Sequence, residues 1–150
     1  MVQAESRSSF FISIPKINVI STILPNIDAS NEKEYREVLK KGIAHAKGTA
    51  LPGEKGIVYL FAHSSGPPWE LTRYNTIFFR LGELSTNDEI VIEKDGKKYL
   101  YKVTDKKVVW PQDTTYLLQK SDKDQLVLQT CYPIGTDLQR LLVIAIPKPT

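Results

Sequence analysis

The apolar stretch Leu126-Val127-Leu128-Gln129-Thr130-Cys131 ends at the only cysteine of the chain. A short apolar run bounded by turn residues is typical of a buried strand. The following residues, Tyr132-Pro133-Ile134-Gly135, indicate a loop because they contain Pro and Gly. A second apolar run, Leu141–Ile146, starts directly after Arg140. If the two strands are antiparallel neighbours joined by this loop, Arg140 lies close to Cys131.

Short apolar or alternating runs occupy much of the remaining chain. The continuous run Ile57–Ala62 predicts a central strand, with His63 directly after its end. Asp95-Gly96 is a strong hairpin signal between two further runs. The other predicted strands are Phe10–Ile14, Val19–Leu24, Glu89–Glu93 and Lys98–Trp110. Many short strands separated by turn residues predict a mostly β barrel or sandwich.

Two prolines set the expected limits of the first strands. Pro15 lacks the N–H group that a ladder requires, so the strand Phe10–Ile14 is predicted near a sheet edge. Pro25 is expected to close the strand that begins at Val19.

One long helical pattern covers Asn31–Ala46. Asn31 with Glu34 three residues later resembles a capping box, and apolar residues then recur at intervals of three and four. Gly42 weakens the pattern and is the alternative end of the helix. His45, near the end of the full pattern, is expected to be a cationic helix-end or packing residue. Shorter helices are predicted within Leu71–Leu84 and Thr114–Gln119.

Length and composition limit the class of protein. A chain of 150 residues suits one domain, here residues 10–150 after a polar lead-in, or remnant of expression, over residues 1–9. One cysteine excludes an internal disulfide framework and a Cys-rich zinc ribbon. The net charge of +3 is spread over mixed-sign clusters, which argues against a nucleic-acid surface. The sequence has no apolar run of about 18 residues, the length that spans a bilayer.

Three residues form a candidate set for nucleophilic chemistry. Cys131 stands where a buried strand opens into a loop, and the Arg140 guanidinium would favour a thiolate or hold an oxyanion. His63, also at a strand end, is the candidate proton donor and acceptor. The alternatives are an inert buried cysteine and a surface or capping histidine.

These residues belong to a wider pattern that resembles the sortase family. Leu126–Cys131 followed by Arg140-Leu141-Leu142-Val143 is similar to the sortase signature, in which a strand ending in Thr-Cys precedes a strand beginning with Arg. The segment from Gly42 through Leu51-Pro52-Gly53-Glu54 to His63 resembles the region before the sortase histidine. Together with the opening Ile12–Ile17, the resemblance covers about residues 10–147.

The resemblance implies an eight-stranded β-barrel with one or two short helices and a cysteine transpeptidase activity. Cys131 would attack an LPXTG-type sorting motif after its Thr to form a thioacyl enzyme, His63 would move protons, and Arg140 would bind the oxyanion or substrate backbone. Thr130 is carried over as a supporting substrate-binding residue. Its other reading is strand packing. Ile134 and Val108 are candidate contacts for the Leu-Pro part of the motif, with packing again the alternative.

Partners and location also follow only from the resemblance. The expected partners are secreted proteins with a sorting motif and an amine of a cell-wall precursor or pilin, with no nucleic acid. We expect the enzyme to act at the extracellular face of the cytoplasmic membrane, held there by an anchor that is absent from this chain. No cofactor is expected. Some sortases bind calcium, but Glu54, Asp113 and Asp122 are few for a cation that takes six or more oxygens, so no required metal is predicted.

Two other readings of the same residues stay open. One is a non-catalytic β-barrel binding module in which Cys131 is inert. The other is an L,D-transpeptidase-like cysteine enzyme, whose signature places His and Gly just before the cysteine, where this chain has Gln129-Thr130.

Overall fold

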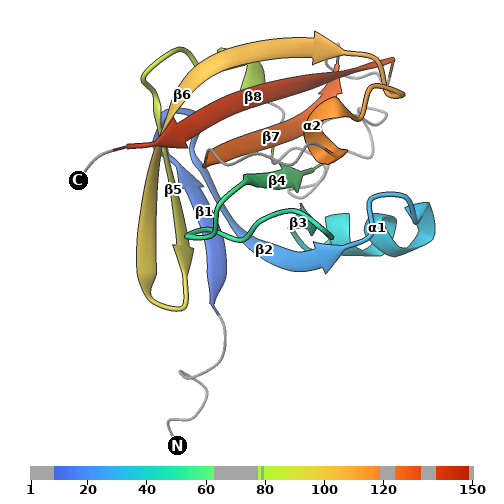
Figure 1. Cartoon of the computed structure of the whole chain (residues 1–150), viewed down its shortest axis with the longest axis horizontal. Coiled ribbons are helices and arrows are strands. Elements are labelled where there is room, and N and C mark those ends of the chain that lie inside the picture. Colours follow the sequence, from blue (N-terminus) through green and yellow to red (C-terminus); the bar gives the residue numbers. More distant parts are fainter. Residues whose placement is uncertain (1–8, 63–77, 79, 119–123, 133–137, 149–150) are drawn as a thin grey trace, which may run out of the picture.

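Eight strands close into a barrel in the computed structural model, which describes residues 9–62, 78, 80–118, 124–132 and 138–148 (Figure 1). Hydrogen-bonded neighbours follow the order β1-β2-β3-β4-β7-β8-β6-β5. The predicted mostly β, eight-stranded barrel with short helices is therefore confirmed. The strands are β1 (Phe10–Ile14), β2 (Val19–Ile27), β3 (Ile43–Ala46), β4 (Ile57–Phe61), β5 (Glu89–Lys94), β6 (Lys97–Val109), β7 (Gln125–Tyr132) and β8 (Gln139–Pro147). The helices are α1 (Glu32–Leu39) and α2 (Thr115–Leu118), with 3-10 turns at Pro15–Ile17 and Leu81–Glu83.

Alternation of side chains along the strands builds the core. In β1 every second residue is buried, and in β6 the side chains of Tyr101 and Val103 are buried on the same face. The central strands β4 and β7 are apolar on both faces, as expected for strands covered on two sides. These two strands run parallel, with Ile57 opposite Gln125 and Phe61 opposite Gln129.

The first strand is not at a sheet edge. β1 pairs with β2 on one side and with β5 on the other, because the sheet closes on itself. Pro15 needs no ladder partner because it lies just after the strand, where it starts the 3-10 turn. The expectation of an edge strand was therefore wrong.

The second strand continues past Pro25, contrary to the prediction that it ends there. Between Leu24 and Ile27 its parallel pairing with β3 shifts by one residue, so Pro25 lies in a bulge that needs no ladder donor. Asn26 has a positive φ of 59° in this bulge, and its N–H donates to Nδ1 of His45 at 3.0 Å.

The long helix predicted over Asn31–Ala46 is correct only in its first half. The Asn31 side chain caps α1 by accepting from the N–H of Glu34 at 3.1 Å, but the helix ends at Leu39. The remainder forms β3, in which His45 is fully buried. Burial lowers the His45 pKa, so the expected cationic helix-end role was wrong and the packing role is what the structure has.

Other local predictions are confirmed. Asp95 and Gly96 both have positive φ values, 53° and 83°, and join β5 to β6 as a tight hairpin. The helical turn predicted within Thr114–Gln119 is α2. Most of the helix predicted within Leu71–Leu84 lies outside the described residues, which show the turn Leu81–Glu83 there.

Both helices lie at one end of the barrel, and the β5–β6 hairpin lies at the other (Figure 1). The carboxyl ends of β4 and β7 point toward the helix end, at the right of the picture. Parallel strands bring their ends to the same edge, so the residues that close β4 and β7 meet there.

Candidate active site

Cys131 and Arg140 are directly opposite each other on the antiparallel strands β7 and β8. This is the arrangement predicted from the loop between the two apolar runs. Both side chains are half-buried, and Nη1 of Arg140 donates to the carbonyl oxygen of Gln139 at 3.0 Å. An always-charged fork of N–H donors therefore stands beside a thiol at the edge of the barrel.

A cavity of about 280 Å³ opens on this face. Its floor comes from the ends of β4 and β7, and its two sides come from the α1 region and from the connection between β6 and α2. The lining residues are Ala29, Tyr35, Leu39, Tyr59, Phe61, Ala62, Pro111, Asp113, Thr114, Gln129, Cys131 and Arg140. The Cys131 sulfur thus shares one cavity with a guanidinium, a carboxylate, a carboxamide and two phenols.

The floor carries a polar pair that crosses between the central strands. The phenol of Tyr59 donates a hydrogen bond to the side-chain carbonyl of Gln129. Burial raises the pKa of Tyr59, with Arg140 opposing that rise and Asp113 adding to it, so the phenol is neutral and remains a donor. With its carbonyl engaged, the carboxamide of Gln129 keeps its N–H groups for another partner.

One side of the cavity is apolar and belongs to α1. The Tyr35 ring packs edge-on against Phe61 with centroids 5.8 Å apart, and Leu39 is buried beside them. The Asn31 cap orients the first turn of this helix. The apolar side therefore rests on a helix start that the sequence signals correctly.

The other side is built on a local turn. Oδ1 of Asp113 accepts hydrogen bonds from the N–H of Thr115 at 3.1 Å and from its hydroxyl at 2.6 Å. These bonds hold the pKa of Asp113 below its usual value. The Lys107 ammonium stands 5.6 Å from the centroid of the Tyr116 ring and attaches α2 to β6.

The remaining predicted site residues lie apart from this cavity or outside the described chain. Thr130 faces the barrel interior, 3% exposed and opposite Leu141, and within the described part of the chain its hydroxyl has no hydrogen-bond partner. Side chains alternate along a strand, so Thr130 and Cys131 point to opposite faces. Val108 is 44% exposed on β6 and does not line the cavity. His63 and Ile134 lie outside the described residues.

Sequence reasoning missed the polar pair and the α1 side. Gln129 precedes Cys131 by two residues, and a period of two places both on one face, so this signal was available. Tyr59 had only a weak signal, a single hydroxyl inside an apolar run. The sequence contains no signal for the α1 contacts, because they depend on where the end of β2 places the helix at the barrel end.

The described residues do not fit a calcium ion. They contain no cluster of three or more His, Cys, Asp or Glu side chains able to hold a metal. Glu54 lines a different cavity, one oxygen of Asp113 is engaged by Thr115, and Asp122 lies outside the described residues. Among the described helices, none has the length and apolar character needed to cross a membrane.

Comparison with known proteins identifies relatives of this arrangement. The family model of the sortase domain matches residues 12–148. Sortase D of Bacillus subtilis (strain 168) is 29% identical in an alignment 142 residues long; the alignment covers 89% of this chain and 63% of the length of that relative.

Solved structures agree with the sequence comparison. Sortase C-1 of Actinomyces oris superposes with a TM-score of 0.78 at 30% identity, over 94% of this chain and 74% of that one. A pilus-related sortase C of Group B Streptococcus superposes with a TM-score of 0.77 at 33% identity, over 96% and 69% of the two chains. With a family match over nearly its whole length and this barrel beneath it, the chain belongs to the sortase family.

Proposed function

We propose that this chain is a cysteine transpeptidase that cleaves a sorting motif of the LPXTG kind and joins the Thr carboxyl group to an amine. Sortases are transpeptidases, and the observation that carries the proposal is the placement of Cys131 opposite Arg140 in one cavity. The thiolate is the reactive form of cysteine, and a fixed guanidinium favours it.

In the first step, the Cys131 sulfur attacks the carbonyl carbon after the Thr of the motif. The new C–S bond forms as the C–N bond breaks, and the leaving amine takes a proton from His63. Arg140 donates hydrogen bonds to the oxyanion or to the substrate backbone. Ala62, the residue before His63, donates its N–H to the carbonyl oxygen of Gln129 at 3.2 Å, which joins the end of β4 to the strand of Cys131.

In the second step, an amine attacks the thioester carbonyl and gives its proton to His63, and the Cys131 thiolate leaves. Splitting the transfer lets the first product depart before the acceptor arrives. Water in place of the amine would give slow hydrolysis.

The partners follow from the same proposal. They are secreted proteins that carry the motif and an amine of a cell-wall precursor or a pilin. A sortase C related to pili in Group B Streptococcus is among the similar structures and favours the pilin alternative. We place the reaction at the extracellular face of the cytoplasmic membrane.

Mass spectrometry tests the proposal. The protein is incubated with a library of sorting-motif peptides and either a glycine or a lysine amine. We expect an acyl adduct on Cys131 and an amine-dependent ligation product, both lost in Cys131→Ala. A protein that forms no adduct with any motif, and whose Cys131 alkylates at the same rate in His63→Ala and Arg140→Ala variants, would instead be a non-catalytic binding module.

A further inference from the structure

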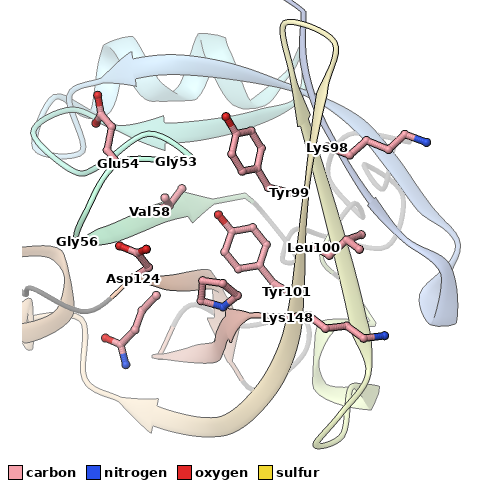
Figure 2. A pocket seen from close by; sticks show the side chains of 12 residues that line it. Gly53, Glu54, Gly56, Val58, Lys98, Tyr99, Leu100, Tyr101, Asp124 and Lys148 are labelled. Atoms are coloured by element: carbon pink, nitrogen blue, oxygen red, sulfur yellow. The ribbon is translucent and has the colours of Figure 1, made fainter. Parts of the chain in front are cut away.

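A second cavity, of about 200 Å³, is lined by residues of β6, of the β3–β4 loop and of the start of β7 (Figure 2). Gln125 lines it at the start of β7, whereas Cys131 stands near the end of the same strand. At roughly 3.3 Å per residue the two positions are about 20 Å apart, so this cavity is not part of the candidate active site.

The floor of the cavity contains a buried tyrosine with an unused hydroxyl. Tyr101 is only 4% exposed, and no group in the described part of the chain hydrogen-bonds to its hydroxyl. Figure 2 shows the rings of Tyr99 and Tyr101 side by side, both projecting from β6 toward the β3–β4 loop and β7. Thr130 supplies the only fully buried side-chain atom without a partner among the described residues, so the Tyr101 hydroxyl is open to the cavity that the residue lines and is available to a ligand.

Two carboxylates stand at the rim. Glu54 comes from the β3–β4 loop, and Oε1 of its side chain accepts from the N–H of Leu51 at 2.9 Å, which holds the group in place. Asp124 precedes β7 and lies close enough to Tyr101 to raise the pKa of that phenol, together with burial, to about 12. Two acidic side chains therefore line the cavity together with the tyrosine rings.

The lysines at its edge do not cancel this charge inside the cavity. The side chains of Lys98 and Lys148 extend away from the tyrosine rings in Figure 2, and Lys148 is ion-paired with Glu89. Lys97 lies with its ammonium 5.4 Å from the centroid of the Tyr99 ring. That contact is an example, within the chain itself, of an alkylammonium on this ring.

The loop wall is shaped closely against the first tyrosine. Gly53 has a φ of +91°, and a Cβ there would lie 3.0 Å from the Tyr99 hydroxyl oxygen. A side chain at this position would push into the ring, so glycine lets the loop pack on Tyr99.

The chemistry of the lining selects the kind of ligand. An anion would meet two carboxylates, and an apolar group would leave the Tyr101 hydroxyl unpaired. A hard divalent cation is usually held by several carboxylates, and the described residues contain no group of three or more His, Cys, Asp or Glu side chains that could hold one. A cation with N–H donors and an apolar stem matches all of the groups, since the stem can pack on Val58, Pro147 and the rings.

We propose that this cavity binds a primary alkylammonium group of about the size of a lysine side chain. Its N–H groups would donate to the Asp124 carboxylate and to the Tyr101 hydroxyl oxygen. The group is carried either by a lysine of a peptide or by a free diamine. Because of its distance from Cys131, an amine bound here is not the acceptor of the proposed transfer, and the proposal stands apart from that function.

The test is an NMR titration of the whole ¹⁵N-labelled chain. One arm uses Nα-acetyl-lysine N-methylamide and another uses 1,5-diaminopentane, which separates a peptide lysine from a free diamine. A third arm uses the norleucine analogue, which has the same stem without the amine, and a fourth uses calcium chloride. We expect saturable shifts of the Gly53, Gly56 and Gln125 amide signals with at least one amine and not with norleucine.

Variants connect these shifts to the named groups. Asp124→Asn changes one exposed side chain without altering its size, and we expect at least a tenfold loss of affinity. Tyr101→Phe should lower the affinity for the amine severalfold. A dispersed NMR spectrum of this variant shows that it is folded. Lys98→Ala is the matched control and should bind like the parent chain. Equal shifts with norleucine, shifts with calcium alone, no saturable shift with either amine, or unchanged binding in Asp124→Asn would each overturn the proposal.

Discussion

The Tyr59 phenol on β4 hydrogen-bonds to the Gln129 carboxamide on β7, on the floor of the cavity that contains Cys131. The bond joins two strands that are distant in sequence. The carbonyl oxygen of the carboxamide faces Tyr59, and its NH₂ group remains for a peptide bound along the floor. Gln129 is therefore a candidate substrate-positioning residue for the proposed reaction.

Replacing Gln129 by Met should weaken substrate binding rather than thiol chemistry. The side chain keeps its length but loses its N–H donors. We expect KM for a motif peptide to rise roughly 3- to 10-fold, the size of one hydrogen bond, with little change in kcat. Steady-state kinetics with the best motif peptide measures both constants.

Tyr59→Phe is the companion variant, which leaves Gln129 present but no longer held. It should give a smaller rise in KM. In both variants the rate at which iodoacetamide alkylates Cys131 should match that of the parent chain. A lower kcat with altered alkylation would instead mean that the pair acts on the thiol.

Removing the guanidinium should slow the acyl transfer itself. Loss of one oxyanion donor typically lowers kcat by about 10² to 10³, and we expect Arg140→Ala to fall in that range. Arg140→Lys keeps the charge but lacks the planar fork, so it should recover only part of the activity. Single-turnover formation of the Cys131 adduct is the measurement, and a full recovery by Lys would show that charge alone is needed.

Lower pH should destabilise the fold through His45. Its Nδ1 accepts from Asn26, its Nε2 lies 2.9 Å from the Ala50 carbonyl oxygen, and burial lowers its pKa in the folded state. The unfolded chain takes up this proton near pH 6.5 and the folded chain does so only at lower pH. Stability is therefore full above that value and is lost as pH falls, by up to about 1.4 kcal/mol per pH unit.

Urea unfolding between pH 7.5 and pH 5 measures this slope. His45→Gln offers an acceptor and a donor but no titration, so its free energy of unfolding should vary less with pH over the same range. Carboxylates with lowered pKa values, such as Asp28 and Asp88, titrate below this window. An unchanged slope in His45→Gln would assign the pH dependence to another group.

Adding one methyl group at Gly42 should destabilise the protein. A Cβ there would lie 2.7 Å from the backbone carbonyl oxygen of Thr22, which cannot move without disturbing β2. We expect Gly42→Ala to lower the free energy of unfolding by on the order of 1–3 kcal/mol.

Gly82→Ala is the matched control, since its Cβ would meet only Leu141 at an ordinary 3.5 Å. Its free energy of unfolding should change by less than about 0.5 kcal/mol. Equal losses in the two variants, measured by urea unfolding, would contradict the steric explanation.

Local sequence was a good guide wherever one short-range signal decides the structure. The Asp95-Gly96 hairpin, the Asn31 cap and the strand of Cys131 all depend on residues within a few positions of one another. The pairing of Cys131 with Arg140 was also predictable, because a short loop joins neighbouring antiparallel strands.

Local sequence misled where a distant partner competes. The helical spacing after Asn31 extends to Ala46, but pairing with β2 and β4 draws Ile43–Ala46 into the barrel. Pro25 predicts the end of a strand, but β2 continues beyond it. A bulge accommodates the proline, and the buried His45 ring accepts the N–H of the next residue, Asn26.

The sequence by itself determined the alternation that makes a barrel, the strand end at Cys131 and the arginine that follows it. Only the tertiary structure decided which side chains share a cavity. Tyr59 meets Gln129 through the parallel pairing of β4 and β7, and closure of the barrel places Tyr101 and Asp124 in the lining of one cavity. These contacts join segments far apart along the chain. Their positions depend on the packing of the whole core, which no local pattern encodes.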